Sequence, residues 1–176
     1  MKALAIFFIP LLSSHEVSAE ILSGGDVLLD GPNWSITWDG EPSGFRSLEM
    51  VSETLTSTLV GECYLDNEFR VSLITAENYS SLEPVVLNFT NAEGKSLAQH
   101  ATSHALENGS TLFLSDPDHL RESPRRSRKV VSEMLLSERF VVVVQQREIT
   151  SEAFVFYNTP IAWYYISQYC NIDLAN

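Results

Sequence analysis

The segment between Phe140 and Cys170 constrains the fold of this chain more than any other, because it combines a dense run of β-branched residues with a helix that ends on a cysteine. Four consecutive valines, Val141 to Val144, follow Phe140, and β-branched side chains fit the pleated surface of a strand. So short and dense an apolar run predicts a strand that is buried on both faces. Apolar residues then alternate over residues 154–157, which predicts a second strand with one buried face.

A C-terminal helix is predicted over about residues 160–169. Thr159 followed by Pro160 is a helix-start signal, since the hydroxyl can accept a hydrogen bond from an orphan amide and proline at the first helical position sacrifices none. Apolar residues three and four positions apart then share one helical face, which should carry the last cysteine into the core. The residues of this face are Trp163, Ile166, Tyr169 and Cys170.

The start of the chain has the features of a secretory signal peptide. Lys2 provides the charged start, residues 3–12 form an apolar core, and residues 17–19 (Val-Ser-Ala) fit a cleavage site of small residues. The alternative is a membrane anchor, but an apolar run of about ten residues is half of what spans a bilayer. We therefore expect residues 1–19 to be a signal peptide and residues 20–176 to form a single secreted or periplasmic β-rich domain, with no transmembrane segment after cleavage.

Composition and motifs narrow the classes of function. The chain has 176 residues, of which 44% are hydrophobic, so it can bury a core without additional cross-links. Its formal net charge of −12 argues against nucleic acid as a general partner, because the phosphate backbone would repel it. The sequence contains no Gly-x-Ser-x-Gly motif, phosphate-binding loop or dinucleotide fingerprint, and no pair of carboxylates at recognisable catalytic spacing. We therefore expect a protein that is not an enzyme and that has no catalytic residues and no cofactor.

The two cysteines, Cys63 and Cys170, are predicted to form one disulfide. In an oxidising compartment two cysteines on apolar faces most simply pair with each other. On the side of Cys63, residues of equal parity along a Thr-rich strand should face the core together, namely Leu55, Leu59, Cys63 and Leu65. The alternatives are two separate buried thiols or a redox or catalytic cysteine, but the chain has no Cys-x-x-Cys motif and no histidine close to either cysteine in sequence.

Short apolar runs separated by turn signals indicate an antiparallel architecture. Asp66-Asn67 separates the strand of Cys63 from a strand that starts at Phe69, which predicts a tight hairpin. Asn108-Gly109 is the clearest hairpin signal, since both central residues of such a turn must accept positive φ. The predicted class is α+β and mostly β, an antiparallel β-sandwich or curved sheet with a late helix (about 124–138) and a C-terminal helix (about 160–169).

Three residues near the start of the predicted domain alternate along one strand face, and two of them are tryptophans. They are Trp34, Ile36 and Trp38. An exposed tryptophan pair is a possible platform for carbohydrate, which would make the chain a carbohydrate-binding module. Alternating aromatic residues are more often part of a core, and this is the interpretation we favour.

A cluster of five basic residues contrasts with the acidic composition of the chain. Its members are Arg121, Arg125, Arg126, Arg128 and Lys129. Ser123-Pro124 should begin a helix at this point, and cations at a helix N-terminus oppose the macrodipole by a few tenths to about 1 kcal/mol. The cluster is therefore a candidate contact for an anionic partner, either an acidic protein surface or a lipid headgroup surface. The interpretation we favour is that it balances the protein's own carboxylates in ordinary solvated pairs, and a further alternative is a basic processing site over residues 125–128.

The histidines suggest a second class of function. His100 and His104 are four residues apart, and Asp116, Asp118 and His119 follow beyond the Asn108-Gly109 turn. A hairpin can bring such groups together as a metal site, so the alternative is a metal-binding protein or metal-dependent hydrolase with His100, His104 and His119 as ligands. The spacing lacks the glutamate of a His-Glu-x-x-His motif, and histidines that simply lie at the surface are the favoured interpretation.

Four tripeptides fit the acceptor pattern for N-glycosylation, and they begin at Asn33, Asn78, Asn88 and Asn108. In a eukaryotic or viral source they predict a secreted glycoprotein that binds a host receptor. In a bacterial source they carry no such meaning, and the signal peptide is equally typical of bacteria. We favour the bacterial interpretation.

Two windows of the sequence together resemble a known group of proteins. The first runs from Thr58 to Cys63 (Thr-Leu-Val-Gly-Glu-Cys) with the hairpin that follows, and the second comprises residues 138–144, Phe154 and the 160–170 helix. This arrangement resembles small periplasmic accessory proteins associated with type VI secretion and, more distantly, the invasion-associated locus B group. The resemblance covers less than half of the chain and implies a periplasmic location and a β-rich domain with a terminal helix. Where that group has a glycine before the helix, this chain has Asn158-Thr-Pro160.

The sequence therefore favours a non-enzymatic secreted or periplasmic binding protein that acts through protein–protein contact. The resemblance suggests the bacterial cell envelope or a secretion system as its setting. A protein partner is expected at the basic cluster, an anionic surface is the second possibility there, and nucleic acid is not expected.

Overall fold

The computed structural model describes residues 26–38, 46–63, 68–157 and 160–170, and the predicted signal peptide lies outside them. The protein is α+β and mostly β, as predicted. Its strands are β1 (Asp26–Gly31), β2 (Trp34–Trp38), β3 (Arg46–Val51), β4 (Ser57–Cys63), β5 (Phe69–Thr75), β6 (Val85–Asn91), β7 (Ser96–Leu106), β8 (Gly109–Leu114), β9 (Arg139–Gln146), β10 (Ile149–Thr150) and β11 (Phe154–Tyr157). The helical elements are α1 (Pro124–Val130), the π-helix η1 (Val131–Leu135) and α2 (Pro160–Tyr169).

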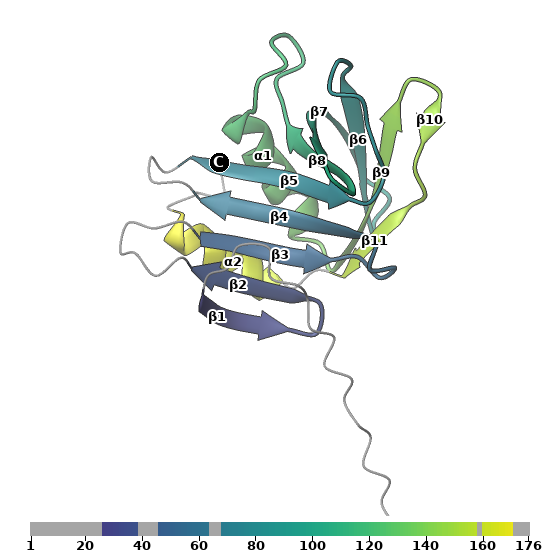
Figure 1. The fold of residues 1–176 in the computed structure, drawn as a ribbon. Helices are drawn as coiled ribbons and strands as arrows, with labels where there is room; N and C mark the ends of the chain where they lie inside the picture. Colours follow the sequence, from purple (N-terminus) through teal and green to yellow (C-terminus); the bar gives the residue numbers. More distant parts are fainter. Residues whose placement is uncertain (1–25, 39–45, 64–67, 158–159, 171–176) are drawn as a thin grey trace, which may run out of the picture.

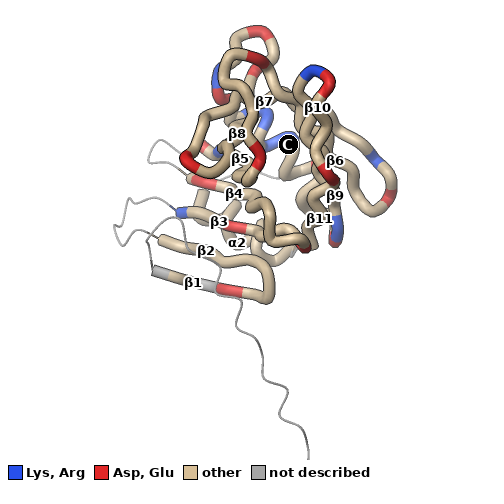
Figure 2. Tube along the Cα trace, turned by 45° about the vertical axis from the view of Figure 1, so that its right-hand side comes forward, with Lys and Arg blue, Asp and Glu red and all other residues tan. Residues whose placement is uncertain are grey.

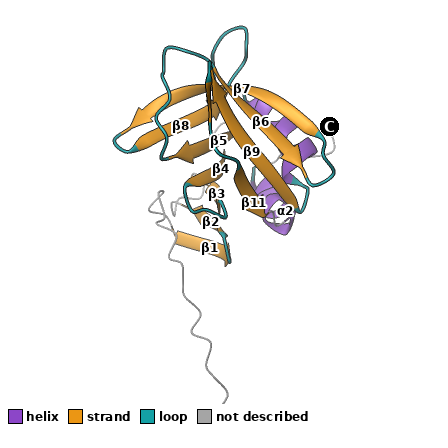
Figure 3. Ribbon diagram, turned by 90° about the vertical axis from the view of Figure 1, so that its right-hand side faces the viewer, coloured by secondary structure: helices purple, strands orange, loops and turns teal. Residues whose placement is uncertain are grey.

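The strands form one strongly curved antiparallel sheet and not two separate sheets. Their order is β1-β2-β3-β4-β5-β8-β7-β6-β9-β10, and β11 also pairs with β9. The sheet bends so that β11 returns toward β3 and β4, and the helices lie on its inner side (Figures 1 and 3). A hydrogen bond of 2.8 Å from the backbone N–H of Glu53 to the carbonyl oxygen of Val155 links the β3–β4 turn to β11.

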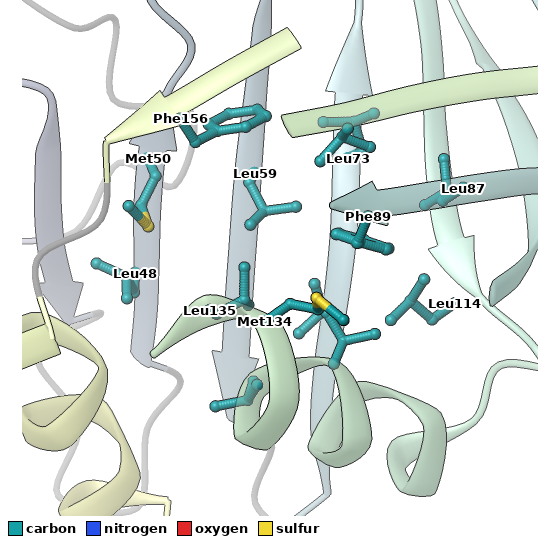
Figure 4. Close-up of a cluster of buried hydrophobic side chains, with 14 of the residues drawn as sticks. Leu48, Met50, Leu59, Leu73, Leu87, Phe89, Leu114, Met134, Leu135 and Phe156 are labelled. Atoms are coloured by element: carbon teal, nitrogen blue, oxygen red, sulfur yellow. The ribbon is translucent and has the colours of Figure 1, made fainter. Parts of the chain in front are cut away.

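The core fills the inside of this curve, between the strands and the helices (Figure 4). Strands from both halves of the sheet contribute to it, and η1 closes it from the helical side. Because the contributing residues are far apart in sequence, burial of their apolar surface stabilises the whole curved sheet at once. Among them are Leu48, Met50, Leu59, Leu73, Leu87, Phe89, Leu114, Met134, Leu135 and Phe156.

Strand β9 is buried on one face only, so the prediction of burial on both faces was wrong. Phe140, Val142 and Val144 are buried, whereas Val141 and Val143 are half-buried. The helices cover the inner side of the sheet alone, and the outer side of the valine run therefore remains partly exposed. On β11, Phe154 and Phe156 are buried and Val155 and Tyr157 are not, in agreement with the predicted alternation.

The late helix is shorter than the predicted 124–138. It begins as expected, with Pro124 at its first positions and the Ser123 hydroxyl accepting a hydrogen bond of 3.4 Å from the Arg126 N–H. After Val130 it continues as the π-helix η1, and its end is held by a hydrogen bond of 2.7 Å from the Ser137 hydroxyl to the Met134 carbonyl. Across the wider π turn, two pairs of adjacent residues are buried in the core. The first pair is Val130 and Val131, and the second is Met134 and Leu135.

Helix α2 has the predicted extent and is held against the sheet by Trp163. The indole Nε1–H donates to the sulfur of Met50 at 3.2 Å, and the ring meets Phe69 edge-on with centroids 6.3 Å apart. A Cβ on Gly61 would lie 2.9 Å from this ring, so glycine provides the space for it. Tyr169 was predicted on the buried face but is 40% exposed, because its ring lies under the guanidinium of Arg46 outside the core. Thr159, the predicted cap, lies outside the described residues.

The predicted disulfide between Cys63 and Cys170 is present, with Cα atoms 5.5 Å apart. Leu59 and Cys63 face the core as expected. Leu55 was wrongly grouped with them, because it lies in the turn before β4 with φ of 59° and is 63% exposed. Leu65 lies outside the described residues. The disulfide ties the end of α2 to the end of β4.

Both predicted hairpins join neighbouring antiparallel strands. The Asp66-Asn67 turn lies outside the described residues, and the pairing of Cys63 with Phe69 places β4 beside β5. Between β7 and β8, Leu106 pairs with Gly109, so the two turn residues are Glu107 and Asn108 rather than Asn108 and Gly109. Gly109 has φ of 133°, and a Cβ there would lie 2.0 Å from the carbonyl oxygen of Thr75. The close approach of two backbones therefore requires glycine here.

The tryptophan face of β2 belongs mainly to the interior, as favoured above. Ile36 is fully buried, and Trp34 packs against the core. Trp38 is half-buried, and the guanidinium of Arg46 lies 5.7 Å from its ring centroid. The cation occupies one face of this ring, which is not the open platform that carbohydrate stacking uses.

Candidate partner-binding surface

Helix α1 is fixed to the sheet through one face, and this determines which side chains it presents. Ser127 and Val130 are buried on that face. The hydroxyl of Ser127 accepts a hydrogen bond of 2.8 Å from the backbone N–H of Val71 on β5. Because residues three and four apart share a face, the remaining side of the helix points away from the sheet. Arg125, Arg128 and Lys129 lie on that outward side and are exposed.

The five predicted cations lie on α1 and three residues before it, and we call them the basic patch, defined as Arg121, Arg125, Arg126, Arg128 and Lys129. Four of them are exposed, and Arg126 is half-buried. Helix α1 contains no acidic residue. Carboxylates are distributed over the strands and loops of the rest of the molecule (Figure 2). The basic patch is therefore a local exception on the surface of a chain whose net charge is −12.

The ion pairs of the described residues lie outside the basic patch. Within the described ranges the ion pairs involve other cations: Arg70 contacts Glu68 at 2.8 Å and Glu122 at 2.5 Å, Lys95 contacts Glu133 at 3.0 Å, and Arg147 contacts Glu83. In the same part of the chain no ion pair includes a member of the basic patch. Even Glu122, the direct neighbour of Arg121, is turned toward Arg70. The interpretation that the basic patch balances internal carboxylates is therefore not supported.

Helix stability does not account for the placement of the basic patch. Arg125 and Arg126 occupy the first turn, which contains no acidic residue, and they oppose the partial positive charge of the helix N-terminus. Only Arg128 and Lys129, in the last turn, favour the macrodipole. Charged residues that lower the stability of their own helix, with no compensating contact elsewhere in the protein, are typical of functional surfaces.

The three histidines predicted as metal ligands are not assembled into a site. His100 and His104 lie on β7, where four residues span about 13 Å. His119 belongs to the turn after β8, and the ring of His104 meets Phe113 edge-on with centroids 5.1 Å apart. Across the described residues no group of three or more histidine, cysteine, aspartate or glutamate side chains is placed to hold a metal ion.

Glu49 and Tyr79 are two buried residues with altered pKa values that no sequence motif indicated. Burial, followed by repulsion from Glu62, raises the pKa of Glu49 on β3. Burial and the hydrogen bond that its hydroxyl donates to Glu77 raise the pKa of Tyr79 far above its usual value. Glu49 occupies a regular polar position of an alternating strand, so only the tertiary structure shows that it is 4% exposed. Neither group has a catalytic partner beside it in the described structure.

The glycan acceptor positions differ in accessibility. Asn78 and Asn108 are exposed, whereas Asn33 and Asn88 are half-buried. The side-chain amide of Asn33 also donates a hydrogen bond of 3.3 Å to the carbonyl oxygen of Tyr157.

In the part of the chain that is described, none of the helices has the length and apolar character needed to cross a bilayer.

No protein-family model, curated protein sequence or solved structure matches the chain.

Proposed function

We propose that this protein is a non-enzymatic binding protein that contacts an acidic surface of a partner protein through the basic patch. The observation that carries the proposal is the absence of ion pairs at five cations close together in sequence, within the described ranges, where Arg70, Lys95 and Arg147 are all paired with carboxylates. Desolvating such cations is compensated when a partner supplies carboxylates with matching geometry.

The charge distribution favours one orientation of approach. A cluster of cations on a chain of net charge −12 attracts an acidic partner to that point, because the negative charge of the chain as a whole repels it. Complementary charge of this kind mainly raises the association rate and fixes the orientation of the complex. Nucleic acid would contact an extended surface of the protein, and the carboxylates around the basic patch would repel its phosphates.

We place the protein in the periplasm or outside the cell, in the bacterial envelope. The Cys63–Cys170 disulfide supports an oxidising compartment, and the features of residues 1–19 support export. Its assignment to a secretion system rests on the resemblance of two sequence windows alone. Intact mass of the exported protein tests the location: a chain that begins at Glu20 without glycan supports it, and glycan on the four acceptor sites contradicts a bacterial source.

The proposed contact is tested by charge reversal. Replacing Arg125, Arg126, Arg128 and Lys129 by glutamate should abolish co-purification of the partner, while circular dichroism and the melting temperature show an intact fold. As a matched single-site comparison, Arg128→Glu should weaken the complex and Arg139→Glu should not, since Arg139 is an exposed arginine on β9. Binding by wild type should weaken steeply with salt. Unchanged recovery of the partner by the fourfold variant would refute the proposal.

A further inference from the structure

Strand β7 has an unpaired edge in the middle of the sheet. It is 11 residues long and pairs with β6 through Ala101 and with β8 through Leu106 (Figure 3). The β6 ladder stops at the Val85–Ala101 pair, so the last five residues of β7 have a strand neighbour on the β8 side only. An open strand edge is a template for a further strand.

The hydrogen-bond register shows which backbone groups this edge offers. The N–H of Ser115 donates to the carbonyl oxygen of His100 at 2.8 Å, so even-numbered residues of β7 bond to the β8 side. In an antiparallel ladder the direction alternates, and the N–H and C=O groups of Ser103 and Ala105 therefore point to the open edge. The described part of the chain makes no backbone hydrogen bond with either residue at that edge.

The edge is kept open by the residues that precede β6. Pro84 has no N–H to donate, and Glu83, which would face Ser103 if the ladder continued, gives its carbonyl oxygen to the side chain of Gln146 at 3.1 Å. The same buried amide also bonds to both backbone groups of Ser80, at 2.9 Å each. Gln146 thereby fixes residues 80–83 outside the ladder, whereas Tyr79, earlier in the same segment, accepts a hydrogen bond of 2.9 Å from the hydroxyl of Ser103, which is 4% exposed.

A groove of about 430 Å³ lies along this edge. Its walls include Ser81, Glu83, Pro84 and Leu120, and its floor is β7 from Ala101 to Ala105. Leu120 adopts φ of 49°, which is uncommon for leucine, and is 48% exposed in the wall. Leu82 and Leu106, next to lining residues, are 90% and 46% exposed. Leu120 offers an apolar contact in the groove, and Leu82 and Leu106 are exposed beside it.

We propose that this groove binds an extended peptide segment, which adds to β7 as a strand through the N–H and C=O groups of Ser103 and Ala105. Main-chain hydrogen bonds provide the affinity in this mode of recognition, and side-chain contacts provide the selectivity. The ligand carries basic residues beside apolar ones, because the whole chain is acidic, with a net charge of −12, and the exposed Glu107 lies two residues beyond the end of the groove; Glu83 in the wall is already paired with Arg147. Leu120 in its wall directly precedes Arg121 of the basic patch, but the proposal does not depend on the function proposed for that patch.

The test uses the full secreted chain and two capped synthetic peptides of equal length, one alternating valine with lysine and the other valine with glutamate. Binding is measured by fluorescence anisotropy. We expect saturable binding of the lysine peptide and at least tenfold weaker binding of the glutamate peptide. N-methylation of the lysine peptide at every second amide should abolish binding in one register and leave it intact in the other, since only one set of amides faces β7.

A proline scan identifies the edge on the protein side. Ala105→Pro removes an N–H that the fold does not use and should weaken lysine-peptide binding at least tenfold, with an unchanged circular dichroism spectrum. The control is Ala153→Pro, at an exposed alanine in the loop before β11, which should bind like wild type. The proposal would be overturned if neither peptide bound saturably. It would also be overturned if binding were unchanged both by Ala105→Pro and by the position of N-methylation. Equal binding of the two peptides would overturn its charge selectivity.

Discussion

Removal of the disulfide should destabilise the protein chiefly through its unfolded state. Cys63 and Cys170 are 107 residues apart, and the chain-entropy relation converts a closed loop of that length into about 16 cal/mol/K, or about 4.8 kcal/mol at 25 °C. In the folded state the end of α2 is also held by Trp163 and Ile166, both fully buried. The folded structure should therefore persist in the double variant Cys63→Ala/Cys170→Ala, with a lower free energy of unfolding.

The assay is urea denaturation of the oxidised wild type and of the double alanine variant, followed by circular dichroism and tryptophan fluorescence. We expect a lower midpoint and a larger m value for the variant, because its unfolded chain expands further. Wild type kept reduced serves as the control and should unfold like the variant. A loss below about 1 kcal/mol would refute the loop-closure argument, since domains of this size have only about 5–15 kcal/mol in total. Early, separate loss of the α2 signal would instead show that the disulfide holds this helix locally.

Three further predictions concern particular contacts. Trp163→Ala should cost about 3–5 kcal/mol in urea denaturation because it leaves a cavity against the sheet, and Trp163→Phe should cost less. Glu49→Gln should raise the melting temperature at neutral pH and flatten its pH dependence. Because the pKa of Glu49 is raised in the folded state, its contribution to the free energy of unfolding is greatest below its unfolded pKa and is lost as pH rises through the folded pKa. An unchanged pH profile would contradict this assignment. Gly109→Ala should destabilise more than Gly94→Ala in thermal melts, because both have positive φ but a Cβ at Gly109 meets the carbonyl oxygen of Thr75 at 2.0 Å and one at Gly94 meets open space.

Local chemistry was sufficient to predict many elements. Pro160 and the apolar spacing that follows predicted α2 with its observed bounds, and Ser123-Pro124 predicted the start of α1. The Asn108-Gly109 signal predicted a hairpin at the correct place, although the turn lies one residue earlier. These signals act within a few residues, through backbone dihedral preferences and capping hydrogen bonds, so they do not depend on the rest of the chain.

The sequence by itself determined the class of fold, the bounds of α2, the start of α1 and, with only two cysteines, the disulfide pair. The tertiary structure alone decided which side of the valine strand is covered, that Glu122 pairs with Arg70 and leaves the basic patch unpaired, and that His100 and His104 are held apart along β7. The open edge of β7 likewise depends on Gln146, which lies far from Ser80 and Glu83 in sequence. The physical reason is that ion pairs, burial and strand order depend on which distant segments meet, and sheet curvature, not local preference, brings those segments together.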